Sequence, residues 1–210
     1  MATLDSQEQE QMDALKAWWK DNGKWLMLTV ALVVGGVAAV RGWQSYQNNQ
    51  AGGAAILYAE LEMQLGSNDP KRINDAAAAV MDKFSSTAYA PRAALMAAQI
   101  NIHVRDLARA KTQLQWVIDH SAESGLQNVA RLKLASVMLD EKNYTDALKL
   151  LETTSAEAYT ALFADLRGDV LSAQGKVEEA RTAYKQALDK IEAQSKYRNM
   201  IQMKLDALNG

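Results

Sequence analysis

The longest uncharged stretch of the chain lies near its N-terminus, between Lys24 and Arg41. Its residues, WLMLTVALVVGGVAAV, are apolar all around a helix rather than along one stripe, which is typical of a membrane span. Trp25 and Trp43 stand at the two ends, and tryptophan favours the interface between lipid and water. Because Arg41 can snorkel to that interface, residues 25–43 make a helix of about 28 Å, enough for a thin bilayer. The pattern predicts a transmembrane signal-anchor helix over residues 25–43.

Two other interpretations of this stretch are weaker. A helix buried in a soluble domain would not need a tryptophan at each end. A cleaved signal peptide would place its small-residue site near Val37-Ala38-Ala39. However, residues 1–24 are long and carry five acidic residues, unlike a short basic leader.

Basic residues beside the predicted span indicate its orientation, because basic flanks tend to stay in the cytoplasm. Three lysines lie on the N-terminal side of the span, namely Lys16, Lys20 and Lys24. On the C-terminal side, Arg41 is the only basic residue before Lys71. We therefore predict a cytoplasmic tail over residues 1–24 and, in a Gram-negative cell, a periplasmic domain over residues 44–210. The expected protein is a single-pass type II protein of the inner (cytoplasmic) membrane, in contact with inner-membrane lipid.

Three small residues follow one face of the predicted span at intervals of four, at Ala31, Gly35 and Ala39. Such a face lets two helices approach closely in lipid, so it is a predicted contact for a partner helix. The alternative is that Gly and Ala are simply common in membrane helices.

The tail before the span has its own apolar positions at helical spacing: Met12, Leu15, Trp18 and Trp19. They are consistent with an interfacial helix on the inner leaflet. The alternative is a partly disordered tail whose last turns merge with the anchor.

From Gln44 onward the chain reads as successive amphipathic helices of about 12–18 residues. No segment shows a sustained period of two with β-branched residues, so no strand is predicted. Residues that stop or cap helices, such as Gly, Asn, Ser and Pro, mark the breaks between the helices. These breaks are predicted at residues 66–70, 85–86, 121–125, 142–143, 153–155, 174–175 and 194–195.

The predicted helices repeat in pairs. Residues 164–190 follow the register of a tetratricopeptide repeat (TPR), with small or apolar residues at Gly168, Leu171, Gly175, Ala180, Tyr184 and Ala187. The residue equivalent to Ala180 recurs at Ala147 and Ala110. The spacings are 33 and 37 residues, close to the TPR period of about 34. Residues 54–84 make a more degenerate fourth pair.

This recurrence decides between two all-α folds. A generic helical bundle would show the same apolar stripes, but it would not require small residues to recur in register. A pair of repeat helices cannot bury its apolar face alone, so successive pairs stack. The sequence therefore predicts an all-α protein: a TPR-like α-solenoid with an N-terminal transmembrane helix and a C-terminal capping helix near residues 196–208.

The concave face of such a solenoid is lined by the first helix of each pair and is the usual binding surface. Most of the positions expected there are apolar, which suits an extended or helical peptide with exposed apolar side chains. The alternative is that several of them pack against neighbouring helices. The predicted groove consists of Arg92, Leu95, Gln99, Ile102, Val129, Leu132, Ser136, Leu139, Leu162, Asp165, Asp169 and Ser172.

Asp165 and Asp169 lie four residues apart on one predicted helix face. Two carboxylates at this spacing are able to hold a cation or meet a basic peptide. A solvated helix face is the simpler interpretation.

Composition excludes several classes of function. Lys and Arg number 23 and Asp and Glu 25, for a net charge of −2, so the chain lacks the basic footprint of a nucleic-acid-binding protein. It has no Cys and only two His, His103 and His120, both expected to be structural or solvent-exposed. No phosphate-binding, zinc-protease or serine-hydrolase motif occurs. We expect no catalysis, no metal and no cofactor.

Four segments resemble one bacterial family, that of the ancillary SecYEG translocon subunits (YfgM). They are Val40-Arg41-Gly42-Trp43, residues 128–138, Ala164-Asp165-Leu166-Arg167-Gly168-Asp169, and Met200-Ile201-Gln202-Met203-Lys204-Leu205. The resemblance implies an inner-membrane protein with a periplasmic TPR-like domain. It further implies association with the SecYEG translocon and with a membrane-anchored periplasmic chaperone of the peptidyl-prolyl isomerase type. Such a protein would assist the folding or trafficking of translocated proteins.

A second hypothesis, also suggested by the family, is a membrane-tethered scaffold that binds and restrains a stress-response regulator in the cytoplasm. It requires either the reverse topology or a functional role for residues 1–24. An enzyme is a third possibility, but it would need a convergent polar pocket that the sequence does not show.

Overall fold

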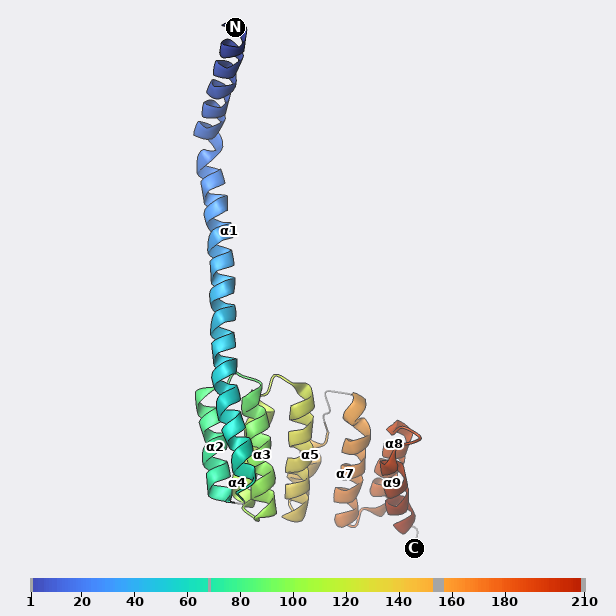
Figure 1. The fold of residues 1–210 in the computed structure, drawn as a ribbon. Coiled ribbons are helices and arrows are strands. Elements are labelled where there is room, and N and C mark those ends of the chain that lie inside the picture. Colours follow the sequence, from blue (N-terminus) through green and yellow to red (C-terminus); the bar gives the residue numbers. More distant parts are fainter. Residues whose placement is uncertain (1, 68, 153–156, 209–210) are drawn as a thin grey trace. The chain divides into compact units, whose positions relative to one another are not determined.

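The computed structural model describes residues 2–67, 69–152 and 157–208, with side chains from residue 8 onward. Every regular element in these ranges is helical, which confirms the all-α prediction (Figure 1). The chain divides into two compact units, residues 1–49 and residues 50–210. The elements are α1 (Ala2–Leu65), α2 (Pro70–Lys83), α3 (Tyr89–His103), α4 (Leu107–His120), α5 (Ser124–Asp140), α6 (Tyr144–Leu150), the short 3₁₀ helix η1 (Glu157–Tyr159), α7 (Thr160–Ala173), α8 (Val177–Lys190) and α9 (Lys196–Ala207).

The first unit is the N-terminal part of α1. Among the described residues, α1 is the one helix that is long and apolar enough to cross a membrane. Its apolar side chains are exposed on all sides, and Trp25 and Trp43 are exposed by 72% and 63%. The hydroxyl of Thr29 donates to the carbonyl oxygen of Trp25 at 2.9 Å, so this polar group is satisfied within the helix. The helix runs unbroken through both predicted boundaries of the span.

The second unit is built from helix pairs. α3 pairs with α4, α5 with α6 and α7 with α8. The last turns of α1 share a buried cluster with α2, in which Leu61 packs with Ile73 and Val80. Buried apolar residues form four successive clusters, most of which join neighbouring pairs, rather than one central core. Alanines supply much of the buried surface, among them Ala94, Ala98, Ala110 and Ala147. Small side chains allow the helices to cross closely, which explains why the small residues recur in the sequence.

Each of the last three pairs has the same turn between its two helices. Arg105, Lys142 and Gly175 adopt the left-handed conformation, with φ of 63°, 62° and 75°. In each turn the next residue donates its N–H to a carbonyl five residues earlier, as Asp106 does to Asn101 at 2.8 Å. The break at Arg105 was not predicted, because Val104, Arg105 and Asp106 include no Gly, Asn, Ser or Pro, whereas Asn143 marks the equivalent turn at Lys142. A residue with a side chain in this conformation costs about 1–2 kcal/mol, which tertiary packing offsets.

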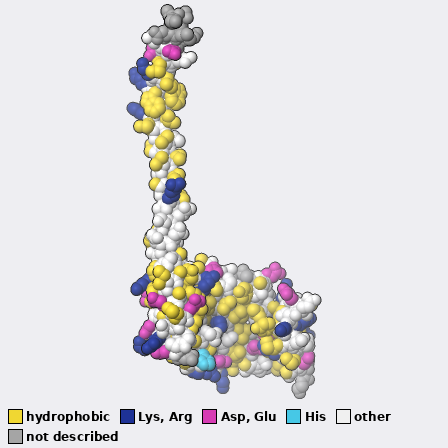
Figure 2. Space-filling model, viewed as in Figure 1, with side chains coloured by type: hydrophobic (Ala, Val, Ile, Leu, Met, Phe, Trp, Pro, Cys, Tyr) yellow, Lys and Arg dark blue, Asp and Glu magenta, His cyan; other side chains and the backbone are white. Residues whose placement is uncertain are grey.

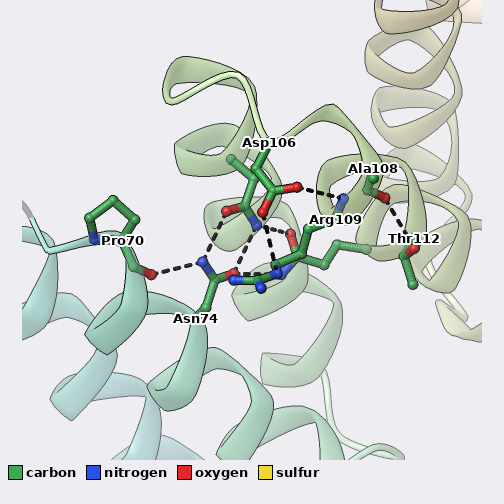
Figure 3. Close-up of polar contacts among 8 residues, drawn as sticks. Pro70, Asn74, Asp106, Ala108, Arg109 and Thr112 are labelled. Atoms are coloured by element: carbon green, nitrogen blue, oxygen red, sulfur yellow. Dashed lines mark hydrogen bonds and ion pairs between the residues drawn. The ribbon is translucent and has the colours of Figure 1, made fainter.

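A buried amide cluster joins α2, α3 and α4 (Figure 3). Asn74 and Asn101 exchange two hydrogen bonds of 2.9 and 2.8 Å, and Gln113 bonds to both residues. Asn74 also donates to the carbonyl oxygen of Pro70 at 2.7 Å. Asn74 and Asn101 are buried, so the two bonds between them satisfy amide groups that are removed from water. The cluster therefore fixes how the first two helix pairs pack together.

The last helix, α9, covers the end of the array. Ser195 caps it by accepting the N–H of Tyr197 at 3.3 Å, and Ile201 and Leu205 are buried in the cluster shared with α7 and α8. Two arginines also tie α9 to α8. Arg198 donates to the carbonyl oxygen of Leu188 at 2.8 Å, and Arg181 donates to that of Leu208 at 3.3 Å. This arrangement confirms the predicted C-terminal capping helix.

Candidate functional site

The predicted groove residues lie on α3, α5 and α7, the first helices of three successive pairs. Figure 2 shows hydrophobic side chains gathered over the part of the second unit where Figure 1 draws these helices. Gln99 and Ser136 are exposed and Asp165 is buried. The other predicted positions are half-buried: Arg92, Leu95, Ile102, Val129, Leu132, Leu139, Leu162, Asp169 and Ser172.

The apolar groove positions have two roles. Leu95 and Ile102 pack against the buried cluster formed by α3, α4 and α5. Leu132 and Leu139 pack against the next cluster, which α5, α6 and α7 share. Each of these side chains therefore contributes to the core with one side and presents its other side to the surface. Such a face offers a peptide apolar contacts that are already held in place by packing.

Polar groove residues connect α3 to the start of α5. The guanidinium of Arg92 makes two hydrogen bonds with the carboxylate of Glu123, at 2.7 and 2.9 Å, and a third with the carbonyl oxygen of Ala88. These bonds lower the pKa of Glu123 and raise that of Arg92. Lys133 on α5 donates to the side-chain oxygen of Gln99 on α3. Arg92 and Gln99 thus hold two neighbouring repeats together.

The acidic pair is not open to a ligand in the structure. Lys204 of α9 makes hydrogen bonds to both oxygens of Asp165, at 2.9 and 3.0 Å, and to Asp169 at 2.8 Å. Only 8% of Asp165 is exposed. The sequence placed this pair either in the groove or on a solvated face. The structure corrects both interpretations, because the capping helix supplies the cation that the two carboxylates bind.

Burial and charge act against each other in this cluster. Burial raises the pKa of Asp165, against the opposing effect of Lys204. Burial alone would lower the pKa of Lys204, but its hydrogen bonds to Asp169 and Asp165 outweigh that effect and raise it. The hydroxyl of Tyr184 donates to Asp169 at 2.8 Å, and its pKa is raised mainly by burial. The hydrogen bonds between Lys204 and the two carboxylates therefore offset the cost of burying these charged groups.

The same segment contains a close approach between α7 and α8. A methyl group at Gly168 would overlap the ring of Tyr184, which is buried. Ala164 is also buried, in the cluster that contains Tyr184. The residues 164–169, which carried much of the family resemblance, thus have a structural explanation: they attach α8 and α9 to α7.

Two surface hollows involve residues outside the predicted groove. The first, of about 450 Å³, is lined by residues of α4, α5 and α6, including Ile118, Met138 and Leu150. The second, of about 470 Å³, shares Met138 and includes Trp116 and His120. The rings of Trp116 and His120 stack at 4.5 Å, and the Nδ1 atom of His120 lies 2.9 Å from the carbonyl oxygen of Trp116. This stacked pair was not predicted from the sequence. It was predictable, because Trp116 and His120 are four residues apart on one helix and therefore lie on the same face.

The small residues Ala31, Gly35 and Ala39 lie on α1 in the first unit, and all three are exposed. No heavy atom lies within 4 Å of the position that a side chain at Gly35 would take. This face has room for the close approach of another helix, and its use stays a prediction.

The second unit consists of stacked helix pairs with recurrent small residues, which define a TPR-like helical-repeat protein. The helix that precedes them is long and apolar enough to cross a membrane. Residues 16–210 match the tetratricopeptide repeat-like domain family TPR_21. A solved structure titled "MamA RS-1 ArsTM double mutant" has a TM-score of 0.54 at 18% identity, over 74% of this chain and 94% of that one. These likenesses confirm the predicted TPR-like fold.

Similarity over nearly the whole chain defines the family more closely. A protein of Neisseria gonorrhoeae named "Ancillary SecYEG translocon subunit" is 32% identical over 96% of this chain and 97% of its own length. A protein of Escherichia coli K12 with the same name is 31% identical over 96% and 97%. The chain belongs to the family of ancillary SecYEG translocon subunits (YfgM), as its sequence indicated. The relatives' name describes a non-catalytic role.

Proposed function

We propose that this protein is a membrane-anchored interaction module that associates with the SecYEG translocon. Residues 25–43 anchor it in the inner membrane, and residues 50–210 lie in the periplasm. There the TPR-like unit binds translocated polypeptides and a membrane-anchored chaperone of the peptidyl-prolyl isomerase type, and so assists the folding or trafficking of secreted proteins. The names of the relatives, the apolar α1 and the repeat fold support this proposal.

The observation that carries the proposal is the half-exposed apolar face across α3, α5 and α7. Leu95, Val129 and Leu162 lie on three successive helices of this face. A segment of a partner that exposes apolar side chains gains free energy by covering them, and a polypeptide leaving a translocon is such a segment. Within the membrane, Ala31, Gly35 and Ala39 are the proposed contact for a translocon helix.

Crosslinking from the groove tests this binding directly. A photoreactive amino acid at Ser136, which is exposed on α5, is expected to form adducts with translocated proteins or the chaperone in intact cells. The matched control carries the same photoreactive amino acid in place of Thr145, which is exposed on α6. In the same assay Leu132→Asp and Leu139→Asp should abolish the adducts, because a carboxylate in an apolar contact is strongly unfavourable.

Circular dichroism of each variant separates lost binding from lost folding, because both leucines also contact the core. Equal adduct yields at Ser136 and Thr145, or adducts that persist in the folded Asp variants, would show that the groove is not the binding surface.

A cytoplasmic scaffold is the second candidate function, and membrane topology separates it from the first. Protease added to intact spheroplasts is expected to digest residues 50–210, or to release them, without lysis. The expectation rests on the three lysines that precede the span and the single arginine that follows it. If that unit is protected until the cells are lysed, the scaffold becomes the better account.

A further inference from the structure

Residues 12–19 of α1 carry an apolar face that no described residue covers. Met12, Leu15, Trp18 and Trp19 are each about half exposed or more, between 49% and 60%. On a helix these positions fall on one side, whereas Asp13, Ala17 and Asp21 fall on the other. Two adjacent tryptophans are a large apolar area for a helix surface to leave in water.

Basic residues border this apolar face. Lys16, Lys20 and Lys24 follow one another at intervals of four, and Lys16 and Lys20 lie beside the apolar face, whereas Lys24 turns toward the far side, near the position of Asp13. Glu10, Asp13 and Asp21 lie on that far side, and Glu8 lies one turn before Met12. Lys16 pairs with Asp13 at 3.3 Å, whereas Lys20 and Lys24 form no ion pair within the ranges that the structure describes. Lysines next to an apolar stripe match a lipid surface, where the ammonium groups reach the headgroups and the apolar side chains reach the acyl chains.

A notch in this segment brings the two kinds of side chain together. It is lined by Trp19, Lys20, Gly23, Lys24 and Met27. The indole of Trp19 lies against Gly23, where an added methyl group would stand 3.2 Å from the ring. Two ammonium groups thus stand beside an indole directly before the predicted span. This combination suits an anionic lipid, whose phosphate binds lysine while its glycerol region contacts the indole.

We propose that residues 8–24 form a membrane-binding element that lies along the leaflet on the N-terminal side of the span and binds its anionic lipid headgroups. The inference rests on the membrane anchoring in the proposed function. Continuity with the span favours lipid over a protein partner, because Lys24 immediately precedes Trp25 and the segment cannot leave the vicinity of the bilayer. Asn22 and Gly23 are weak helix formers, so a bend at this point costs little and would let the segment turn into the membrane plane.

The absence of cysteine makes this proposal testable with single spin labels on the full chain. The variants Met12→Cys and Leu15→Cys place labels on the apolar face, and Ala14→Cys and Ala17→Cys are matched controls on other sides of the helix. Each protein is reconstituted into two kinds of vesicle. One kind contains the anionic lipid phosphatidylglycerol, and the other contains only phosphatidylcholine. In the anionic vesicles, the ratio of collisions with oxygen to collisions with a water-soluble nickel complex should be several-fold higher at residues 12 and 15 than at residues 14 and 17.

A second comparison tests the role of the lysines. Replacing Lys16 and Lys20 with Gln in the Leu15→Cys protein should lower this ratio in anionic vesicles and leave it unchanged in phosphatidylcholine. If the replacement has no effect in anionic vesicles, headgroup binding by these lysines is overturned.

One further label separates this inference from the proposed function. A label at Val33→Cys, inside the span, should be exposed to lipid in every preparation. If it is not, the membrane anchoring itself is wrong. If Val33 is in lipid but all four labels on residues 12–17 are open to the nickel complex, the segment extends into water and only the further inference fails. Labels at residues 12 and 15 that are shielded from both reagents would show a protein contact and would also overturn it.

Discussion

Replacing Lys204 with Met is expected to lower the free energy of unfolding by about 2–3 kcal/mol, because it leaves two carboxylates near each other without their cation. Asp165 is buried, so water cannot replace the lost partner. The loss is smaller than for a fully buried pair, since the side chain of Lys204 is 27% exposed. Urea unfolding of the full chain in detergent micelles, followed by circular dichroism, measures it.

Two further variants identify the cause of this loss. Lys185→Met removes an exposed lysine from α8 and should change the stability little. Adding Asp165→Asn and Asp169→Asn to Lys204→Met should recover most of the loss, because no unpaired charge then remains. If Lys204→Met is as stable as Lys185→Met, the ion cluster does not hold α9 in place.

The effect of Lys204→Met should also depend on pH. The folded-state pKa of Lys204 is raised above 10.5, so its contribution to stability is complete below that pH and is lost as the pH rises through the folded-state pKa. The variant and the natural protein should therefore converge in strong alkali. They should also converge in acid, because the buried Asp165, whose pKa is already raised, takes up a proton and no longer needs a cation.

Replacing Gly168 with Ala is expected to destabilise the protein by about 2 kcal/mol, although alanine is the better helix former. The added methyl group would overlap the ring of Tyr184. That ring cannot easily move, since it is buried and its hydroxyl donates to Asp169 at 2.8 Å. Thermal or urea unfolding of the full chain measures the change.

Gly52 provides the matched control for this substitution. It also lies inside a helix, but a methyl group there would meet no heavy atom within 4 Å. Gly52→Ala should therefore be neutral or should stabilise the protein by up to about 1 kcal/mol, through helix propensity alone. If Gly168→Ala behaves like Gly52→Ala, the contact between α7 and α8 has enough freedom to absorb the methyl group.

The candidate groove was predictable only in part. Its apolar positions follow from the repeat register, and the structure leaves residues such as Leu95 and Val129 half-exposed at the surface. The bonding partners of its polar residues could not be predicted from that register. Register alone does not show that Arg92 is bound to Glu123 or that Asp165 is bound to Lys204, because these partners lie 31 and 39 residues away. Contacts over such distances depend on how whole repeats stack.

The sequence by itself determined the features that come from local pattern. An uncharged run bounded by Lys24 and Arg41 determines an exposed apolar helix, and small residues in register determine stacked helix pairs. The tertiary structure alone decided the turn at Arg105, where packing overrides the local preference for glycine, and the ion cluster in which Lys204 of α9 neutralises two carboxylates of α7. The physical reason is that helix formation follows from nearby residues, whereas a buried charge is tolerated only if a distant segment folds back to pair with it.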